Sequence, residues 1–248
     1  MRMRRNSKLA PGFSLVEMAV VLMILGFVLG ALLMPIRVQR QQQALQQTQN
    51  MLEISQKSLL GYAQTQGRLP CPASRNGSGV FPDDKGVANP VAGGACAVTA
   101  GFLPAVTLGI QPVDVNGFAL DGWGNPIRYA VTQSREGGLA TPDFTSTGDM
   151  GTVGIAALKP NLRVCASSTS CTDDINLVKD AVAVIYSLGA TGGDAPGGAD
   201  ENENLDGNAV FVSHESRKND ANGEFDHVVT WISPFILYNA MIEAGQLH

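Results

Sequence analysis

The chain has 248 residues, with 17 basic and 22 acidic side chains and a formal net charge of −5. This length suits one domain of ordinary size plus an additional segment. A surface with an acidic excess is a poor general binder of nucleic acid, so no nucleic-acid partner is expected.

The chain begins with a basic leader over residues 1–12 that contains four basic side chains and no acidic one. An almost unbroken apolar run follows over residues 13–36. As a helix that rises about 1.5 Å per residue, it is long enough to cross a hydrocarbon core of about 30 Å. Basic residues next to such a run favour a cytoplasmic N-terminus. We therefore expect a single-pass inner-membrane helix with a periplasmic C-terminal domain. The basic residues are Arg2, Arg4, Arg5 and Lys8.

Three residues suggest that the leader is removed and the helix retained. Gly12 precedes the apolar run, whereas an ordinary secretory signal has its small cleavage-site residue after the run. Cleavage after Gly12 would create an α-amine on Phe13 that is mostly charged near neutral pH. Glu17 is the only carboxylate in the run and lies four residues after Phe13, on the same face of a helix. Two such helices, offset along their axes, could neutralise each other's charge.

The stretch from Gly12 to Met18, GFSLVEM, resembles the processing site of type IV pilins and type II secretion pseudopilins. The resemblance implies cleavage after Gly12 by a prepilin peptidase, N-methylation of Phe13 and filament assembly guided by Glu17. It also implies other pilin or pseudopilin subunits and an inner-membrane assembly platform as partners. A plain signal anchor, with Glu17 near the membrane interface, is the alternative. That alternative explains the hydropathy but not the Gly-Phe…Glu arrangement.

Residues 37–67 predict an amphipathic continuation of the helix. They are rich in Gln, Leu, Ala and Lys, which are good helix formers, and contain no proline. Gly67 predicts the end of the helix. Apolar residues at seven-residue spacing predict a narrow stripe that packs on the globular domain of residues 68–248. The stripe residues are Leu45, Leu52, Leu59 and Tyr62.

The globular domain starts with a region dense in Gly, Pro, Ala and Asn at residues 73–116, which predicts loops around a buried anchor at residues 102–104. The segment from Leu120 to Val131 contains Asp-Gly and Gly-Asn-Pro, which are turn sequences, followed by an alternating strand pattern. It resembles the D-x-W-G-x-P stretch of many pseudopilins. We interpret it as a tight turn with a packed Trp123. A partner-binding or sugar-binding tryptophan is the alternative.

The remaining patterns predict four more strands and a C-terminal helix. The helix has Ser233 as N-cap, proline at its first position and a terminal glycine. The fold class is therefore α+β: a long N-terminal helix, with a transmembrane first half, packed on an antiparallel β-sheet with long loops and a short C-terminal helix. The four strands are predicted at residues 162–166, 181–188, 209–213 and 226–232.

The four cysteines fall as two close pairs in the sequence, although four cysteines allow three pairings. Outside the cytoplasm, disulfides are favoured. Neither spacing is C-x-x-C and no histidine lies near either pair, so a zinc site is not expected. The close pairs are Cys71 with Cys96 and Cys165 with Cys171.

An acidic, glycine-rich segment over residues 192–206 offers hard oxygen ligands of the kind that suit Ca²⁺. The acidic and amide residues alternate, but Leu205 occupies the place of the EF-hand glycine, so the pattern does not fit that motif. A solvated acidic loop and a calcium site both remain open, and no other cofactor or metal is expected. The calcium candidates are Asp194, Asp200, Asn202, Asn204 and Asp206.

No catalytic residues are expected. The three histidines are scattered, and the neighbours Asp226 and His227 would point to opposite faces of a strand. Gly-x-Ser-x-Gly, His-Glu-x-x-His and phosphate-loop motifs are absent from the sequence. The sequence favours a pilin-like structural subunit of a type IV pilus or type II secretion-type filament. The long loops and the large globular domain favour a minor subunit. A membrane-tethered or filament-tip adhesin that binds through its loops is a second hypothesis, and an anchored periplasmic protein that never assembles is a third.

Overall fold

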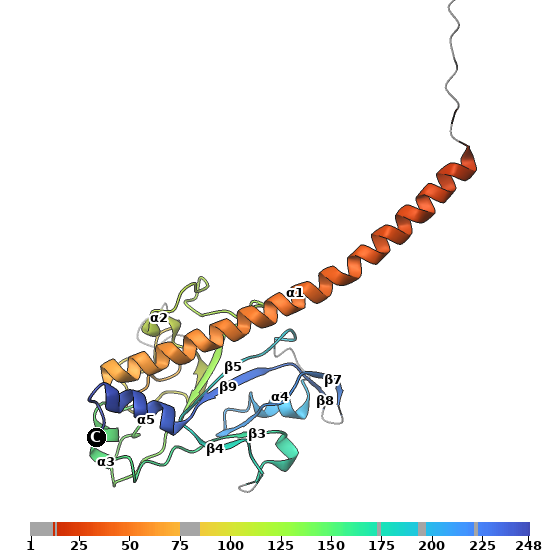
Figure 1. Cartoon of the computed structure of the whole chain (residues 1–248). Coiled ribbons are helices and arrows are strands. Elements are labelled where there is room, and N and C mark those ends of the chain that lie inside the picture. The colour runs from red at the N-terminus through yellow and green to blue at the C-terminus, as the bar shows by residue number, and fades with distance from the viewer. Residues whose placement is uncertain (1–11, 13, 75–84, 173–174, 193–196, 221–222) are drawn as a thin grey trace, which may run out of the picture. The chain divides into compact units, whose positions relative to one another are not determined.

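A computed structural model describes residues 12, 14–74, 85–172, 175–192, 197–220 and 223–248 (Figure 1). The side chains of residues 31–37, 219 and 220 are not part of this description. The chain divides into two compact units, Met1–Gln43 and Ala44–His248. Helix α1 (Leu15–Gln66) begins in the first unit and ends in the second.

In the first unit, the described side chains of α1 are mainly large, apolar and exposed. Leu15 is 87% exposed and Phe27 is 75% exposed. Within the described residues, which leave out the side chains at 31–37, no helix is both long and apolar enough to cross a membrane. The transmembrane assignment of residues 13–36 stays a prediction, since Phe13 and the side chains at 31–37 lie outside the described residues. The exposed large apolar side chains are Leu15, Val16, Met18, Val20, Val21, Leu22, Met23, Ile24, Leu25, Phe27, Val28 and Leu29.

In the second unit, α1 buries a stripe spaced by three and four residues, as expected for one face of a helix. Leu52 and Leu59 belong to it, as predicted, but Leu45 is 39% exposed and Tyr62 is only partly buried. The prediction was wrong for Leu45, because at this level of the helix Ala44 and Thr48, rather than Leu45, contact the turn at Gly122. The buried stripe consists of Ala44, Thr48, Leu52, Ser55, Leu59 and Ala63.

A four-stranded sheet forms the centre of the second unit. Its order is β1 (Ala100–Phe102), β2 (Arg128–Val131), β5 (Ala183–Ser187) and β9 (Val228–Ile232), and every neighbouring pair is antiparallel. All five residues of β5 are buried. Ile185 packs in the core with Leu59 of α1, whereas Val184 and Tyr186 pack in a second core with Phe211. Because β5 is covered on both faces, its sequence is nearly all apolar.

The second sheet has the order β4 (Val178–Ala181), β3 (Leu162–Cys165) and β6 (Val210–Val212). Strands β3 and β4 are antiparallel, but β3 and β6 are parallel, which differs from the expected all-antiparallel arrangement. A separate hairpin pairs β7 (Arg217–Asp220) with β8 (Gly223–Phe225). The predicted strand at 181–188 therefore contains the last residue of β4, from this sheet, and the whole of β5, from the four-stranded sheet.

Short helices complete the described chain: α2 (Ala105–Leu108), α3 (Asp149–Val153), α4 (Ala199–Glu203), α5 (Pro234–Glu243) and a 3₁₀ turn at Ser168–Ser170. Figure 1 shows α5 beside the C-terminal end of α1, where Gln64 Nε2 donates to the Ala240 carbonyl oxygen at 3.1 Å. Helix α5 has proline in its first turn, as predicted, but Ser233 makes no side-chain capping bond. Gly67 ends α1, with its N–H bonded to the Ala63 carbonyl oxygen at 2.9 Å.

The segment around Trp123 forms a tight turn that makes hydrogen bonds with both α1 and β5. Asp121 Oδ1 accepts hydrogen bonds from the backbone N–H groups of Trp123 at 2.9 Å and Asn125 at 2.8 Å. Asp121 Oδ2 accepts from the Ser187 hydroxyl at 2.6 Å. The Gly122 N–H donates to Thr48 Oγ1 at 3.0 Å, and a Cβ at Gly122 would overlap the backbone of α1. Only glycine therefore allows this turn to lie so close to the helix.

Both close cysteine pairs form disulfides, Cys71 with Cys96 and Cys165 with Cys171. The first joins the segment after α1 to the loop that precedes β1. The second joins the end of β3 to the 3₁₀ turn. Phe102, Leu103 and Pro104 are buried, so the predicted anchor of the long loop region is confirmed.

Candidate functional site

The predicted processing and assembly residues lie at the start of α1. Gly12 is exposed and precedes the helix, Phe13 lies outside the described residues, and Glu17 is in the first turn. The Ser14 N–H donates to Glu17 Oε2 at 2.9 Å, and the Glu17 N–H donates to Ser14 Oγ at 3.2 Å. These reciprocal bonds form a capping box, which satisfies backbone donors that the helix itself leaves free. Sequence reasoning missed this role of Glu17, although the S-x-x-E pattern signals it.

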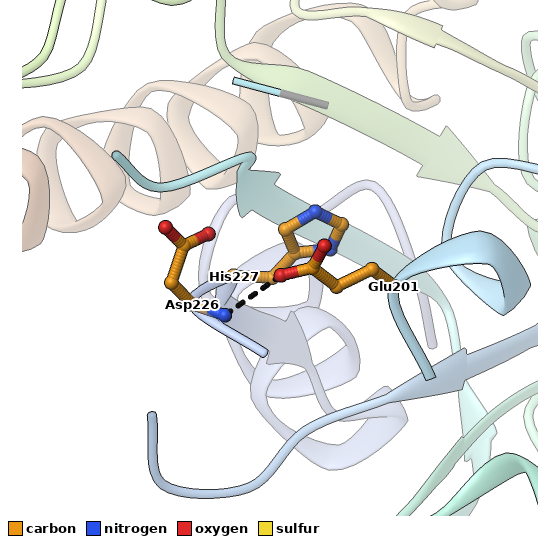
Figure 2. A group of neighbouring side chains, drawn as sticks. All are labelled: Glu201, Asp226 and His227. Atoms are coloured by element: carbon orange, nitrogen blue, oxygen red, sulfur yellow. Dashed lines mark hydrogen bonds between the residues drawn. The ribbon is translucent and has the colours of Figure 1, made fainter. Parts of the chain in front are cut away.

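A second candidate site lies in the globular unit, where Glu201, Asp226 and His227 bring one potential ligand atom each within 4.8 Å of one another (Figure 2). Glu201 is in α4, and the other two residues directly precede β9. Because Asp226 and His227 are not part of the strand, both can face Glu201. The prediction that they point to opposite faces of a strand does not describe this geometry.

Backbone donors hold the two carboxylates of this cluster. Glu201 Oε1 accepts from the Asp226 N–H at 2.9 Å, the bond drawn in Figure 2. Asp226 Oδ2 accepts from the Thr191 N–H at 2.9 Å, and Oδ1 accepts from the Thr191 hydroxyl at 3.0 Å. Gly189 has φ +66°, and a Cβ there would overlap the Asp226 carboxylate. The turn after β5 therefore needs glycine both for its backbone angle and for space.

His227 is neutral in this environment. Burial lowers the pKa of His227 to about 4, while Asp226 raises it and Arg128 lowers it to smaller extents. Asn204 pairs with Val212, since its Oδ1 accepts the Val212 N–H at 2.7 Å and its Nδ2 donates to the Val212 carbonyl oxygen at 3.0 Å. This pairing determines which atom of the Asn204 amide is the nitrogen. The same Nδ2 lies 3.1 Å from His227 Nδ1 and donates to it. The proton of the ring is therefore assigned to Nε2.

The assigned Nε2–H of His227 has no hydrogen-bond partner within the described residues, and His227 is only 4% exposed. A second proton, on Nδ1, would face the Asn204 donor. Burial also raises the pKa of the Glu201 carboxyl, with the Asp226 N–H opposing that shift and nearby carboxylates adding to it. Both shifts have the same physical origin, because each favours the uncharged form of a buried group.

Asp200 and His214 form a neighbouring polar group. Asp200 Oδ1 accepts from the Ser168 N–H at 2.7 Å and hydroxyl at 2.6 Å, and Oδ2 lies 3.2 Å from His214 Nε2. The His214 ring centroid lies 3.9 Å from that of Phe225, whose other neighbour is His227, at 5.6 Å. Ser168 donates to the carboxylate rather than to the imidazole. This order does not activate a serine nucleophile, which needs the imidazole between the hydroxyl and the carboxylate.

The cluster of Glu201, Asp226 and His227 is the set of described residues that could hold a metal ion. Its ligand atoms are nevertheless engaged: Glu201 by a backbone N–H, both Asp226 oxygens by Thr191, and His227 Nδ1 by the Asn204 amide. A cation at the centre would have to displace several of these donors. The arrangement is best explained as a structural junction that fixes α4 to the segment before β9.

The predicted calcium candidates do not gather around one point among the described residues. Asp200 binds Ser168 and His214, Asn202 donates to the Gly197 carbonyl oxygen, Asn204 pairs with Val212, and Asp206 accepts from Asn208. Asp194 lies outside the described residues. The alternation of these residues would place them on one face of a strand, but Ala199–Glu203 is a helix. Residues two apart in a helix point in nearly opposite directions.

Comparisons of the chain with protein-family models, with curated proteins and with solved structures found no match.

Proposed function

We propose that this chain is a pilin-like structural subunit of a type IV pilus or type II secretion-type filament. It is processed after Gly12 and assembles through α1. The observation that carries the proposal is the exposed apolar surface of α1 between Leu15 and Leu29. Apolar patches of this extent on a single chain mark surfaces that another molecule or a membrane covers. A bundle of equivalent helices from neighbouring subunits would bury these side chains.

The motif from Gly12 to Glu17 supports this choice of partner. Its resemblance to prepilin processing sites implies a prepilin peptidase that removes the basic leader and methylates Phe13. Inner-membrane anchoring of the apolar segment before assembly, with the globular unit in the periplasm, is part of the proposal. The two disulfides suit such an oxidising compartment. The enclosed polar junction around Glu201 supports a structural rather than a catalytic role for the globular unit.

Mass spectrometry of the intact protein, with N-terminal sequencing, tests the proposal in native membranes and in sheared surface material. We expect a mature chain that starts at Phe13 and is one methyl group heavier than its sequence. A Glu17→Ala variant should be folded and processed but poorly incorporated into filaments. An uncut chain in cells with an active prepilin peptidase would overturn the proposal.

A further inference from the structure

We propose that a cavity beside α1 is a docking site for an arginine side chain of a basic partner polypeptide. The cavity has a volume of about 420 Å³ and lies within the second unit, between α1 and the segments that contain Asp114 and Asp121. It shares no residue with the exposed apolar surface from Leu15 to Leu29. The inference therefore goes beyond the proposed filament role and does not depend on it.

One wall of the cavity is a face of α1. Gln47, Asn50 and Met51 line it at positions i, i+3 and i+4, which point to the same side of a helix. Gln47 and Asn50 are exposed, and their side chains make no hydrogen bond within the described part of the chain. Their carbonyl oxygens are therefore available as acceptors, and Met51 adds an adaptable apolar surface beside them.

The other wall carries two carboxylates that local hydrogen bonds hold in place. Asp114 Oδ1 accepts the N–H groups of Asn116 at 2.9 Å and Phe118 at 2.8 Å. Two backbone N–H groups and the Ser187 hydroxyl hold Asp121. Neither carboxylate forms an ion pair with any residue that the structure describes. Both line the cavity, so their negative charge acts on a group that enters it.

The chemistry of the two walls matches an arginine side chain. The guanidinium group is a permanent cation with five N–H donors, which suits a site with two carboxylates and two amide oxygens. The methylene groups of arginine can lie on the apolar side chains of Met51, Val113 and Leu120, which also line the cavity. A lysine ammonium is a compact point charge with fewer donors and matches fewer of these acceptors.

The charge of the chain favours a basic partner over a second copy at this site. The chain has a formal net charge of −5, and loss of the basic leader would make it more negative. Like charges on two copies oppose a contact at an acidic cavity, whereas a basic surface is attracted to it. An exposed arginine on such a surface is the group that the cavity would receive.

Nuclear magnetic resonance of the full-length chain in detergent micelles tests the site, with N-acetyl-arginine amide as the added ligand. N-acetyl-citrulline amide is the matched control, because it has nearly the same shape without the charge. We expect the side-chain amide resonances of Gln47 and Asn50 to shift with the arginine compound, with a dissociation constant of about 1–10 mM. The citrulline compound should bind about fivefold more weakly or less. Equal binding of the two compounds, or no shift with either, would overturn the inference.

Substitutions at the exposed position Gln47 test the electrostatic basis, with the Asn50 side-chain amide as the reporter. Gln47→Glu adds a carboxylate and should tighten binding of the arginine compound about threefold. Gln47→Lys supplies a competing cation and should weaken binding about fivefold or more. Gln46→Lys is the control, because it makes the same charge change at an exposed neighbour that does not line the cavity. Equal weakening by the two lysine variants would show that net charge decides binding, and would overturn the inference.

A dilution series without added ligand distinguishes a separate partner from a second copy. We expect the Asn50 side-chain resonance of the wild type to stay in place as the concentration of the chain changes. A resonance that moves with concentration in the wild type, but not in Gln47→Lys, would mean that a second copy occupies the cavity. That result would overturn the assignment to a separate basic partner.

Discussion

The two parts of α1 differ in what covers their apolar side chains. In the second unit, Leu52 and Leu59 are buried within the chain, and the small residues Ala44 and Thr48 that precede them allow the turn at Gly122 to contact the helix. In the first unit, the apolar residues from Leu15 to Leu29 are exposed. The difference shows that the C-terminal part stabilises this fold, whereas the N-terminal part presents a surface.

The largest expected effect comes from matched leucine truncations in the two parts. Leu59 is fully buried, so Leu59→Ala should lower the free energy of unfolding by about 2–5 kcal/mol through lost burial and a cavity. Leu29 is exposed, so Leu29→Ala should change it by less than about 0.5 kcal/mol. Urea unfolding followed by tryptophan fluorescence measures both, since Trp123 and Trp231 lie in the second unit. Equal losses would contradict the comparison.

A smaller effect is expected at the contact between the turn and the helix. Gly122→Ala places a Cβ against the Ala44 backbone, and the resulting overpacking should cost about 1–3 kcal/mol of unfolding free energy. Gly61→Ala is the control on the same helix, because a Cβ there meets no atom within 4 Å. The control should gain about 0.5–1 kcal/mol from helix propensity. Thermal unfolding of both variants gives the comparison, and an unaffected Gly122→Ala would mean that the close approach is not needed.

The sequence predicted much of this fold because its strongest signals are local. The helix over residues 37–66 and its end at Gly67 follow from helix formers without proline and from a terminal glycine. The apolar run at 181–188 predicted a strand, and β5 lies within it. The burial of Ala44, Thr48 and Ser55 could not be predicted in the same way. The burial of Ala44 and Thr48 depends on the approach of Gly122, 74 residues after Thr48, which no local pattern records.

The candidate site in the globular unit was less predictable for the same reason. Its residues come from α4 and from the segment before β9, which are separate in sequence. An acidic, glycine-rich loop suggested calcium ligands from Asp194 to Asp206, but Asp200 and Asn202 lie in helix α4. Asp226 and His227 were expected in a strand, whereas they precede it. Tertiary contacts, rather than residue type, decide which acidic groups meet.

The globular unit should also lose stability in mild acid, because a neutral histidine is buried in it. The pKa of His227 is lowered to about 4 from an ordinary value of 6.5. As the pH falls, His227 therefore takes up its proton in the unfolded chain at a higher pH than in the folded chain. The free energy of unfolding that is present above pH 6.5 decreases as the pH falls towards 4. Between pH 7 and pH 5 this amounts to about 2 kcal/mol. Urea midpoints at the two pH values measure the loss.

Two variants show whether His227 is the source of this pH dependence. His227→Gln should remove most of the loss between pH 7 and pH 5, whereas the control His248→Gln, at an exposed position, should retain it. The raised pKa of Glu201 acts in the opposite sense, because the folded chain then binds a proton more readily than the unfolded chain. Glu201→Gln should therefore make the loss in acid steeper. An unchanged pH dependence in His227→Gln would show that His227 is protonated at little cost and that the Asn204 contact does not fix its tautomer.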